Sequence, residues 1–401
     1  MKQLFPPLGG ECRRLLDELP GLTDRVFPLA QRFRRGLSRD TAELSRLLTS
    51  GREDRNRGYL GETPLLSAYL RYFLPWNIYR LCRLLPALPL TLREGDALTD
   101  LGSGPLTLPM ALWISRPELR SLPLEFRCLD RTGAALEAGV KLFRALAGPD
   151  SPWVLRTIRA SLGERIYGKA AQLVSAVNLF NELFWDIPPG NRKDLSALAE
   201  RQGRLLTALA GEGGSILVVE PGIPRSGEFL TALRTSLLHQ DRPPLAPCPH
   251  DGPCPCPGGA KTKWCHFAFD TAGAPEALDR LSLAAGIPKE RAVLSFLLTG
   301  PRTKAPDRAK PPEGAPLPVR ILSDPFPLPA PREGPKPPAG AVFGRYGCSA
   351  RGLVLVRGSR EDMEQSAAGD LLEVPLPGTE NRDPKSGALV VGYPSPIGPQ
   401  K

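Results

Sequence analysis

Residues 96–108 read Asp96-Ala97-Leu98-Thr99-Asp100-Leu101-Gly102-Ser103-Gly104-Pro105-Leu106-Thr107-Leu108. A short apolar run ends in an acidic residue, and the chain then turns through two glycines into an apolar run of helical character. A turn of this kind lets the backbone approach a ligand closely and directs helix N–H groups toward it. The sequence therefore predicts a strand over 97–101, followed by a ligand-binding loop at Gly102 and Gly104.

Polar residues also close the next apolar runs. Asp130 follows a predicted strand over 126–129, thirty residues after Asp100, where a carboxylate can accept hydrogen bonds from ribose hydroxyls. Asn178 and Asn181 lie at the end of a predicted strand over 173–179, and Glu220 ends another over 216–219. This combination resembles a class I methyltransferase that binds S-adenosylmethionine. The resemblance implies a cofactor site formed by Asp100, Gly102, Gly104, Asp130, Asn178 and Asn181.

The loop departs from the methyltransferase pattern at one position, because the third glycine is Leu106 here. An NAD-dependent enzyme is the alternative for such a loop, but it would more often show a third glycine and a loop near the N-terminus. The segment Asp186-Ile187-Pro188-Pro189 reads as a turn. No catalytic residue is identified from the sequence.

The pattern along the chain predicts an α/β fold with a mostly parallel, Rossmann-like sheet. Leucines at helical spacing make residues 1–90 a helical N-terminal region, and 91–330 form a methyltransferase-like domain with a Cys-rich insertion at 241–270. Apolar runs at 292–298 and 319–322 are expected to complete the sheet. Residues 331–380 read as a small β unit that contains Cys348, and 381–401 as a flexible tail. Helical stripes are predicted at Leu136, Val140, Phe143 and Leu146, and at Phe229, Leu230, Leu233 and Leu237.

Four of the eight cysteines and two of the three histidines lie within about twenty residues, between Cys248 and His266. Prolines and glycines in this segment deny it the hydrogen bonding of a helix or strand, so we expect it to be ordered by a bound group. The run is C-x5-C-x-C-x8-C-H, which matches neither zinc ribbons nor the C-x3-C-x2-C motif of radical enzymes. The sequence therefore predicts a metal centre of another kind.

Two kinds of metal fit these residues. Four thiolates, with Cys348 joining from a distance, suit an iron–sulfur cluster, whereas zinc would accept a mixed set that includes His250 or His266. A disulfide loop is the third reading. It is disfavoured because the N-terminus has no apolar signal-peptide core, which indicates the reducing cytoplasm as the location. Cys12, Cys82 and Cys128 read as small buried hydrophobes.

The net charge of +10 suggests a polyanionic partner, and no apolar run is long enough to cross a membrane. Arginines cluster at 32, 34, 35 and 39 and again at 52, 55 and 57. A further group of arginines, at 71, 80 and 83, lies among aromatic residues at 69, 72, 73, 76 and 79. Arginine and aromatic groups together suit RNA, whereas for any single residue the favoured interpretation is a solvated helical surface with its aromatic side chains in the core.

The glycine loop, Asn181-Glu182-Leu183, Val219-Glu220-Pro221-Gly222 and the cysteine motifs together resemble the methyltransferase-like proteins that assist assembly of the mitochondrial ribosomal small subunit, and their bacterial relatives. The resemblance spans about residues 60–360. It implies a 4Fe–4S cluster held by Cys248, Cys254, Cys265 and Cys348, with Cys256 an alternative ligand or a bystander. It also implies association with small-subunit ribosomal RNA. A monomer is expected.

The function predicted from these features is that of an S-adenosylmethionine-dependent, methyltransferase-like protein that acts on small-subunit ribosomal RNA or in small-subunit assembly, with a structural 4Fe–4S cluster. The alternatives are a catalytically inactive, RNA-binding assembly factor and a zinc-stabilised enzyme with a substrate other than RNA.

Overall fold

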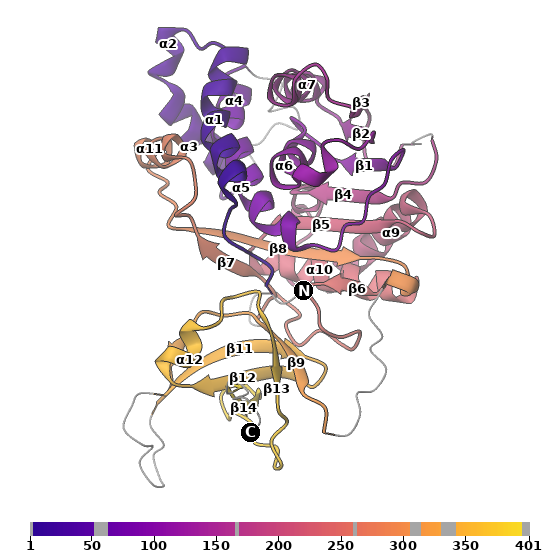
Figure 1. Ribbon diagram of the computed structural model, residues 1–401, viewed down its shortest axis with the longest axis vertical. Helices are drawn as coiled ribbons and strands as arrows, with labels where there is room; N and C mark the ends of the chain where they lie inside the picture. The colour runs from indigo at the N-terminus through magenta and orange to yellow at the C-terminus, as the bar shows by residue number, and fades with distance from the viewer. Residues whose placement is uncertain are drawn as a thin grey trace.

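The computed structural model describes residues 3–51, 63–164, 168–259, 263–304, 314–329 and 342–394, which build two sheets with helices packed mainly around the first (Figure 1). The arginines at 52, 55 and 57 lie outside the described residues. No helix in the described ranges combines the length and the apolar character needed to cross a membrane.

The first sheet contains eight strands, and the five at one side run parallel. β8 then pairs antiparallel with β5, and two short strands pair antiparallel with β8 on its other edge. The sheet is therefore mixed, whereas the sequence predicts a mostly parallel one. In spatial order the strands are β3 (Val154–Arg159), β2 (Glu125–Asp130), β1 (Ala97–Leu101), β4 (Leu173–Val177), β5 (Ser215–Pro221), β8 (Arg291–Thr299), then β6 (Pro244–Ala246) and β7 (Phe267–Asp270).

The order 3-2-1-4-5 with parallel strands is a doubly wound arrangement, and the antiparallel β8 beside β5 gives it the class I methyltransferase-like form. Both faces of the sheet are covered. In β5, Leu217 and Val219 join one core, and Ile216 and Val218 join the other. The first core contains α1 (Gly10–Val26), α5 (Leu74–Leu84), α6 (Thr107–Ser115) and α7 (Gly133–Ala147); the second contains α8 (Phe180–Leu183), α9 (Arg192–Ala210) and α10 (Pro224–His239).

The two predicted apolar stripes are confirmed on α7 and α10. Leu136 and Phe143 are buried on α7, while Val140 and Leu146 pack against the same core. All four stripe residues of α10 are buried. The remaining short elements around this sheet are the 3-10 turns at Pro117–Leu119 and Arg302–Lys304 and the helix α11 (Glu276–Ala284).

The described residues before β1 form helices and no strand, as predicted for the N-terminal region. They are α1, α2 (Gln31–Arg34), α3 (Leu37–Leu48), α4 (Thr63–Ala68), the π-helix η3 (Tyr69–Phe73), α5 and the 3-10 helix η4 (Leu85–Ala87). Ahead of α1 an extended strap buries Leu4 and Phe5, and the Phe5 ring stacks on Phe269 with centroids 4.7 Å apart.

Two arginines predicted as RNA contacts are instead buried ties between segments. The Arg71 guanidinium donates to Asp24 Oδ1 at 3.0 Å, and Arg83 Nε donates to the Pro6 carbonyl at 3.0 Å. Tyr72, Trp76 and Tyr79 are also buried, so the core interpretation is correct for these side chains. A buried arginine saturates its donors on carbonyls and carboxylates, which leaves it unavailable to a phosphate.

A second, six-stranded sheet forms the lower part of the molecule in Figure 1. The run at 319–322 belongs to this sheet and not to the first, so the prediction that it completes the first sheet is wrong. The tail that the sequence predicts to be flexible contains the strand β14. This segment is ordered because Leu389 and Val391 are apolar and become buried where β14 pairs with β12. The strands are β13 (Leu371–Val374), β9 (Leu317–Ile321), β11 (Phe343–Ser349), β12 (Gly352–Gly358) and β14 (Leu389–Gly392), with β10 (Phe326–Pro327) paired to β11 and the helix α12 (Arg360–Glu364) following β12.

The division of the chain remains a proposal. We retain the helical region at 1–90 and the methyltransferase-like domain from residue 91, and the small β unit gains β9 at its beginning and β14 at its end.

Candidate functional site

The glycine loop leaves the carboxyl end of β1 in a left-handed backbone conformation. The φ angles are +65° at Gly102, +50° at Gly104 and +58° at Leu106. The Ser103 amide donates to the Leu129 carbonyl at 2.8 Å, which ties the loop to the end of β2. The loop therefore keeps the turned form expected of a ligand-binding loop, and α6 begins directly after it.

Leu106 occupies the place of the third glycine with its side chain fully buried in the first core. A non-glycine residue in the left-handed region costs about 1–2 kcal/mol. Space for Leu106 comes from Gly139 on α7, where an added Cβ would lie 2.6 Å from Leu106 Cδ1 and 2.4 Å from the Pro105 carbonyl carbon. A glycine missing from the loop is thus matched by a glycine on the neighbouring helix.

Two carboxylates hold the loop from different sides. Asp130 Oδ2 accepts from the Gly104 amide at 2.9 Å, and its Oδ1 accepts from the Thr132 amide at 2.8 Å. Asp100 lies inside the sheet, where the Ser103 and Ser175 hydroxyls each donate to it at 2.6 Å. Burial raises the pKa of Asp100 to about 6. Asp100 is placed to shape the loop, and Asp130 lies at the loop's accessible side.

The space around the two glycines differs. A Cβ on Gly104 would meet no atom within 4 Å, so there is free space beside this glycine, although the residue itself is buried and its amide donates to Asp130. A Cβ on Gly102 would lie 2.7 Å from Leu179 Cδ1, so that glycine packs directly against the residue after Asn178. The free space beside Gly104, with Asp130 next to it, fits a ligand that carries hydroxyl groups.

Asn178 and Asn181 follow β4. Glu220 on β5 holds Asn181 in place through hydrogen bonds. Asn178 has a φ of +55°, which turns the chain into α8. The Asn181 amide nitrogen and side-chain Nδ2 donate to Glu220 Oε2 at 3.1 and 2.9 Å, and the Phe180 amide donates to Oε1 at 2.7 Å. Glu220 is fully buried, and burial raises its pKa to about 7.

A cavity of about 360 Å³ opens beside this pair, at the ends of β4 and β5 and beneath the N-terminal helices. Asn178 and Asn181 line it, together with aromatic residues of η3 and α5. The other predicted cofactor residues, Asp100, Gly102, Gly104 and Asp130, do not line it. The structure therefore divides the predicted cofactor residues between the loop and this cavity.

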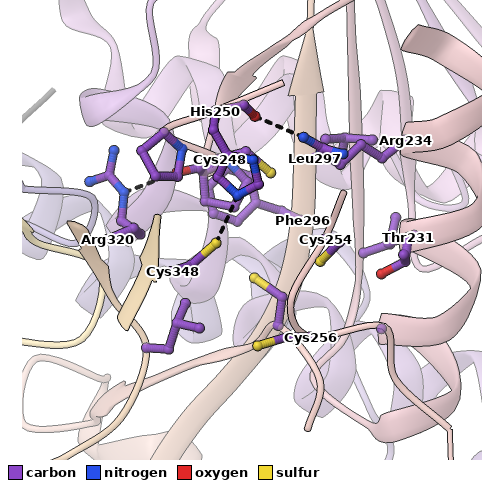
Figure 2. Close-up of a pocket in the computed structure, with 16 residues that line it drawn as sticks. Thr231, Arg234, Cys248, His250, Cys254, Cys256, Phe296, Leu297, Arg320 and Cys348 are labelled. Carbon is purple, nitrogen blue, oxygen red and sulfur yellow. Dashed lines mark hydrogen bonds between the residues drawn. The ribbon is translucent and has the colours of Figure 1, made fainter. Parts of the chain in front are cut away.

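Five cysteines line a second cavity, of about 30 Å³, between α10, β8 and the second sheet. Cys248, Cys254, Cys256 and Cys265 come from the Cys-rich insertion, and Cys348 comes from β11. Figure 2 shows Cys254, Cys256 and Cys348 with their side chains directed toward a common space. The four cysteines predicted as ligands are thus brought to one place, and Cys256 is with them.

Polar contacts fix the walls of this cavity. His250 Nε2 lies 3.2 Å from Cys348 Sγ, and the His250 carbonyl accepts from Arg234 on α10 at 2.7 Å. Arg320 on β9 donates through Nε to the Pro247 carbonyl at 3.0 Å (Figure 2). Both arginines line the cavity and are buried. They place two positive charges beside the sulfur atoms.

The thiols influence one another electrostatically. Burial raises the pKa of Cys265 and Cys348 well above the ordinary range, and the neighbouring Cys248 raises both further. Burial also raises the pKa of Cys256 to about 12. The raised pKa values keep these thiols protonated unless a cation lies among them, and a metal deprotonates the thiols that bind it.

Within the described ranges, no three His, Cys, Asp or Glu side chains are close enough to hold a single metal ion. Each thiolate of a 4Fe–4S cluster binds a different iron, so cluster ligands stand farther apart than the ligands of one ion. Five cysteines around one cavity supply the residue types of such a donor set.

Sequence reasoning did not find Arg234 or Arg320. Arg320 belongs to an otherwise apolar strand and Arg234 to a helix of mixed polarity, and only their burial beside the cysteines distinguishes them from surface arginines. Four of the five aromatic residues that the sequence groups with arginines line the larger cavity, namely Tyr69, Tyr72, Phe73 and Trp76. The sequence does not connect them with Asn178 and Asn181, and it does not single out Trp185.

Several solved structures are similar in fold, at low identity. They include a 16S rRNA methyltransferase, KamB (13% identity, 52% of this chain and 88% of that chain covered, TM-score 0.32). A second is a putative class I S-adenosylmethionine-dependent methyltransferase from Listeria monocytogenes (11% identity, 76% of this chain and 90% of that chain covered, TM-score 0.35). A third is a methyltransferase from Thiobacillus denitrificans in complex with S-adenosyl-L-homocysteine (13% identity, 57% of this chain and 92% of that chain covered, TM-score 0.31). The likeness is too distant to support an inference about function, and the fold assignment rests on the strand order.

No curated protein matches the sequence. The family model described as "Mitochondrial small ribosomal subunit Rsm22" matches residues 193–319, which run from α9 through the Cys-rich insertion to β9. Over this part of the chain, the resemblance to the small-subunit family that the sequence predicts is confirmed.

Proposed function

We propose that this protein is an S-adenosylmethionine-dependent, methyltransferase-like protein that acts on small-subunit ribosomal RNA or in small-subunit assembly, and that a 4Fe–4S cluster stabilises it. The convergence of five cysteines from the insertion and β11 on one cavity carries the proposal. The Rsm22 match supports the ribosomal context. The cytoplasm remains the proposed location, although the family description names the mitochondrial subunit.

Cys248, Cys254, Cys265 and Cys348 would hold the cluster, with Cys256 as the fifth candidate ligand. The cluster would supply covalent links between the insertion and the second sheet. Arg234 and Arg320 offset the negative charge of the thiolates and their cluster. The proposed role of the cluster is structural, because its ligands come from the Cys-rich insertion and from β11, and no shared sheet joins these two segments.

For the cofactor, we propose that Gly104 leaves space beside the loop, that Asp130 accepts hydrogen bonds from the ribose, and that Gly102, Asn178 and Asn181 border the bound molecule. Asp100 supports the loop from inside the sheet. S-adenosylmethionine supplies an electrophilic methyl group when bound. The residues of this chain would act mainly by positioning.

A catalytically inactive RNA-binding assembly factor is the second candidate. The contact of Leu179 with Gly102 favours it, because this side chain fills space over one of the two loop glycines. Calorimetry with S-adenosylmethionine on the cluster-intact protein separates the two. Absence of binding would exclude the methyltransferase, and a methylated ribosomal nucleotide that disappears on deletion of the gene would exclude the inactive factor.

Replacing Cys348 by serine is expected to remove most of the iron and the visible absorption, at about 400 nm, of the anaerobically purified protein. Cys12→Ser is the matched control, because Cys12 lies on α1, outside the cavity, and should leave both unchanged. Iron, sulfide and zinc analysis of the unmodified protein accompanies the variants. A colourless protein with one zinc would replace the cluster by the zinc-stabilised alternative.

Charge reversal at Arg34 and Arg35 on and beside α2 is expected to weaken binding to a small-subunit rRNA fragment and to reduce the dependence of log K on log salt concentration. Each lost phosphate contact lowers that slope by about 0.7–0.9. Electrophoretic mobility shifts at several salt concentrations measure both the affinity and its dependence on salt. Arg360→Glu combined with Arg382→Glu, two exposed positions on the second sheet unit, is the control. An affinity insensitive to salt would contradict the charge argument.

A further inference from the structure

We propose that the 360 Å³ cavity beneath the N-terminal helices is a nucleotide site, which receives one unstacked base together with its phosphate. The inference deepens the proposed function, on which it rests, by naming what the aromatic cavity next to Asn178 and Asn181 would bind. The ligand is a purine or pyrimidine nucleotide, either a residue of an RNA chain or a free mononucleotide.

The cavity lies where ligands bind in doubly wound folds, outside the carboxyl ends of parallel strands. Val177 and Asn178 at the end of β4, and Glu220 and Pro221 at the end of β5, form its floor. Its size falls within the range of about 300–1,000 Å³ typical of small-molecule sites. The floor belongs to the methyltransferase-like sheet, whereas the walls are supplied by the N-terminal region.

A π-helix supplies part of these walls. η3 (Tyr69–Phe73) interrupts an otherwise α-helical run, and three of its five residues, Tyr69, Tyr72 and Phe73, line the cavity. π-Helical turns are rare and occur frequently at functional sites. The irregular turn therefore marks this wall as more than packing.

The aromatic lining suits a flat ring. Tyr69 and Phe73 stack with centroids 5.8 Å apart, and the buried Trp76 lies one turn later. Trp185 also lines the cavity and is 39% exposed. Bases that are taken out of an RNA stack are held by such side chains, and each stacking contact is worth about 1–3 kcal/mol. Amide groups of Asn77 and Asn181 add the hydrogen-bonding character that a base edge requires.

The charges favour an anionic ligand. Arg80 and Lys289 line the cavity, and neither forms an ion pair with any described residue; Arg80 Nη1 donates to Asn77 Oδ1 at 2.8 Å, and the Lys289 ammonium stands 5.8 Å above the Tyr72 ring. The two acidic lining residues are already engaged. Glu182 pairs with Arg131 at 3.3 Å, and Glu220 accepts the three N–H groups described above.

Two donors near the wall, Trp76 Nε1 and Arg80 Nε, have no hydrogen-bond partner in the described structure, but both atoms are buried and do not open on the cavity. The aromatic lining and the two cations are therefore the features that point to a ligand. The aromatic lining, together with two cations that form no ion pair with a described residue, favours a base that carries phosphate.

The test uses 2-aminopurine riboside 5′-monophosphate, whose fluorescence is quenched by stacking, with the full-length, anaerobically purified protein. We expect saturable quenching, weakened about 5- to 100-fold by Trp185→Ala through the loss of one stacking side chain. Lys289→Gln should weaken binding and reduce its salt dependence. Lys141→Ala, an exposed position on α7, is the matched control and should have no effect.

A single-stranded small-subunit rRNA oligonucleotide with one internal 2-aminopurine distinguishes the sources. Quenching of the oligonucleotide at concentrations where the mononucleotide does not bind would assign the cavity to RNA, and equal affinities would assign it to free nucleotides. Absence of quenching with both probes, quenching that neither variant alters, or complete displacement by S-adenosylhomocysteine would each overturn the proposal. The mononucleotide measurement requires neither the cluster nor rRNA binding, so failure of the proposed function would be seen separately.

Discussion

Gly139→Ala is expected to lower the free energy of unfolding by about 1–3 kcal/mol and to displace the glycine loop. The new methyl group would stand 2.4 Å from the Pro105 carbonyl carbon and 2.7 Å from its oxygen, which are backbone atoms of the loop that cannot rotate away. The loss exceeds the gain of up to about 1 kcal/mol that alanine brings to a helix interior. Urea unfolding measures the stability, and calorimetry with S-adenosylmethionine measures the effect on the loop.

Gly21→Ala is the matched control for this substitution. Gly21 also lies inside a helix, α1, but its surface is exposed and a Cβ there would meet only Arg25 Nη1, at 3.7 Å. The control is expected to be neutral or stabilised by up to about 1 kcal/mol. Equal stabilisation of both variants would contradict the close contact between α7 and the loop.

The contribution of Glu220 and Asp100 to stability is expected to fall as the pH rises from about 4 to about 7. Burial raises the pKa of Glu220 from 4.5 to about 7 and that of Asp100 from 3.8 to about 6. The folded protein therefore binds more protons than the unfolded chain in this interval. The stabilisation is fully present at pH values below the pKa of each group in the unfolded chain. It is lost as the pH rises through the raised pKa of the folded protein, and each group contributes on the order of 3 kcal/mol.

The double variant Glu220→Gln, Asp100→Asn isolates this effect, because neither amide titrates. Urea unfolding from pH 4 to 8 should show a stability difference between wild type and variant that changes by several kcal/mol. Glu125→Gln serves as the control of opposite sign, since Arg127 lowers the pKa of Glu125 and its contribution is lost as the pH falls. A constant difference between wild type and the double variant would contradict the pKa shifts.

The sequence predicts the interior of the first sheet well and its edges poorly. β1, β2, β4 and β5 are runs of buried apolar residues, which periodicity detects. The sequence does not predict β3 because it is an edge strand, in which Val154 is 51% exposed and two of the six residues are arginines. The run at 292–298 was located, but its antiparallel direction depends on the connection between β5 and β8 and not on local composition.

The candidate site was anticipated to the extent that it is local in the chain. The glycine loop and the cysteine motifs are short patterns whose chemistry follows from the residue types. Arg234 and Arg320 become part of the cysteine-lined cavity only when α10 and β9 meet, so no local pattern reveals them. The aromatic cavity likewise depends on η3 and α5 reaching β4, a long-range contact that helical periodicity cannot predict.

The strap that carries Leu4 and Phe5 has a consequence for biosynthesis. Phe5 packs on Phe267 and Phe269, and the Phe5 ring leaves no room for a Cβ at Gly369. These partners leave the translating ribosome more than 250 residues after Phe5 does. The emerging chain must therefore keep this aromatic anchor unburied through most of its translation.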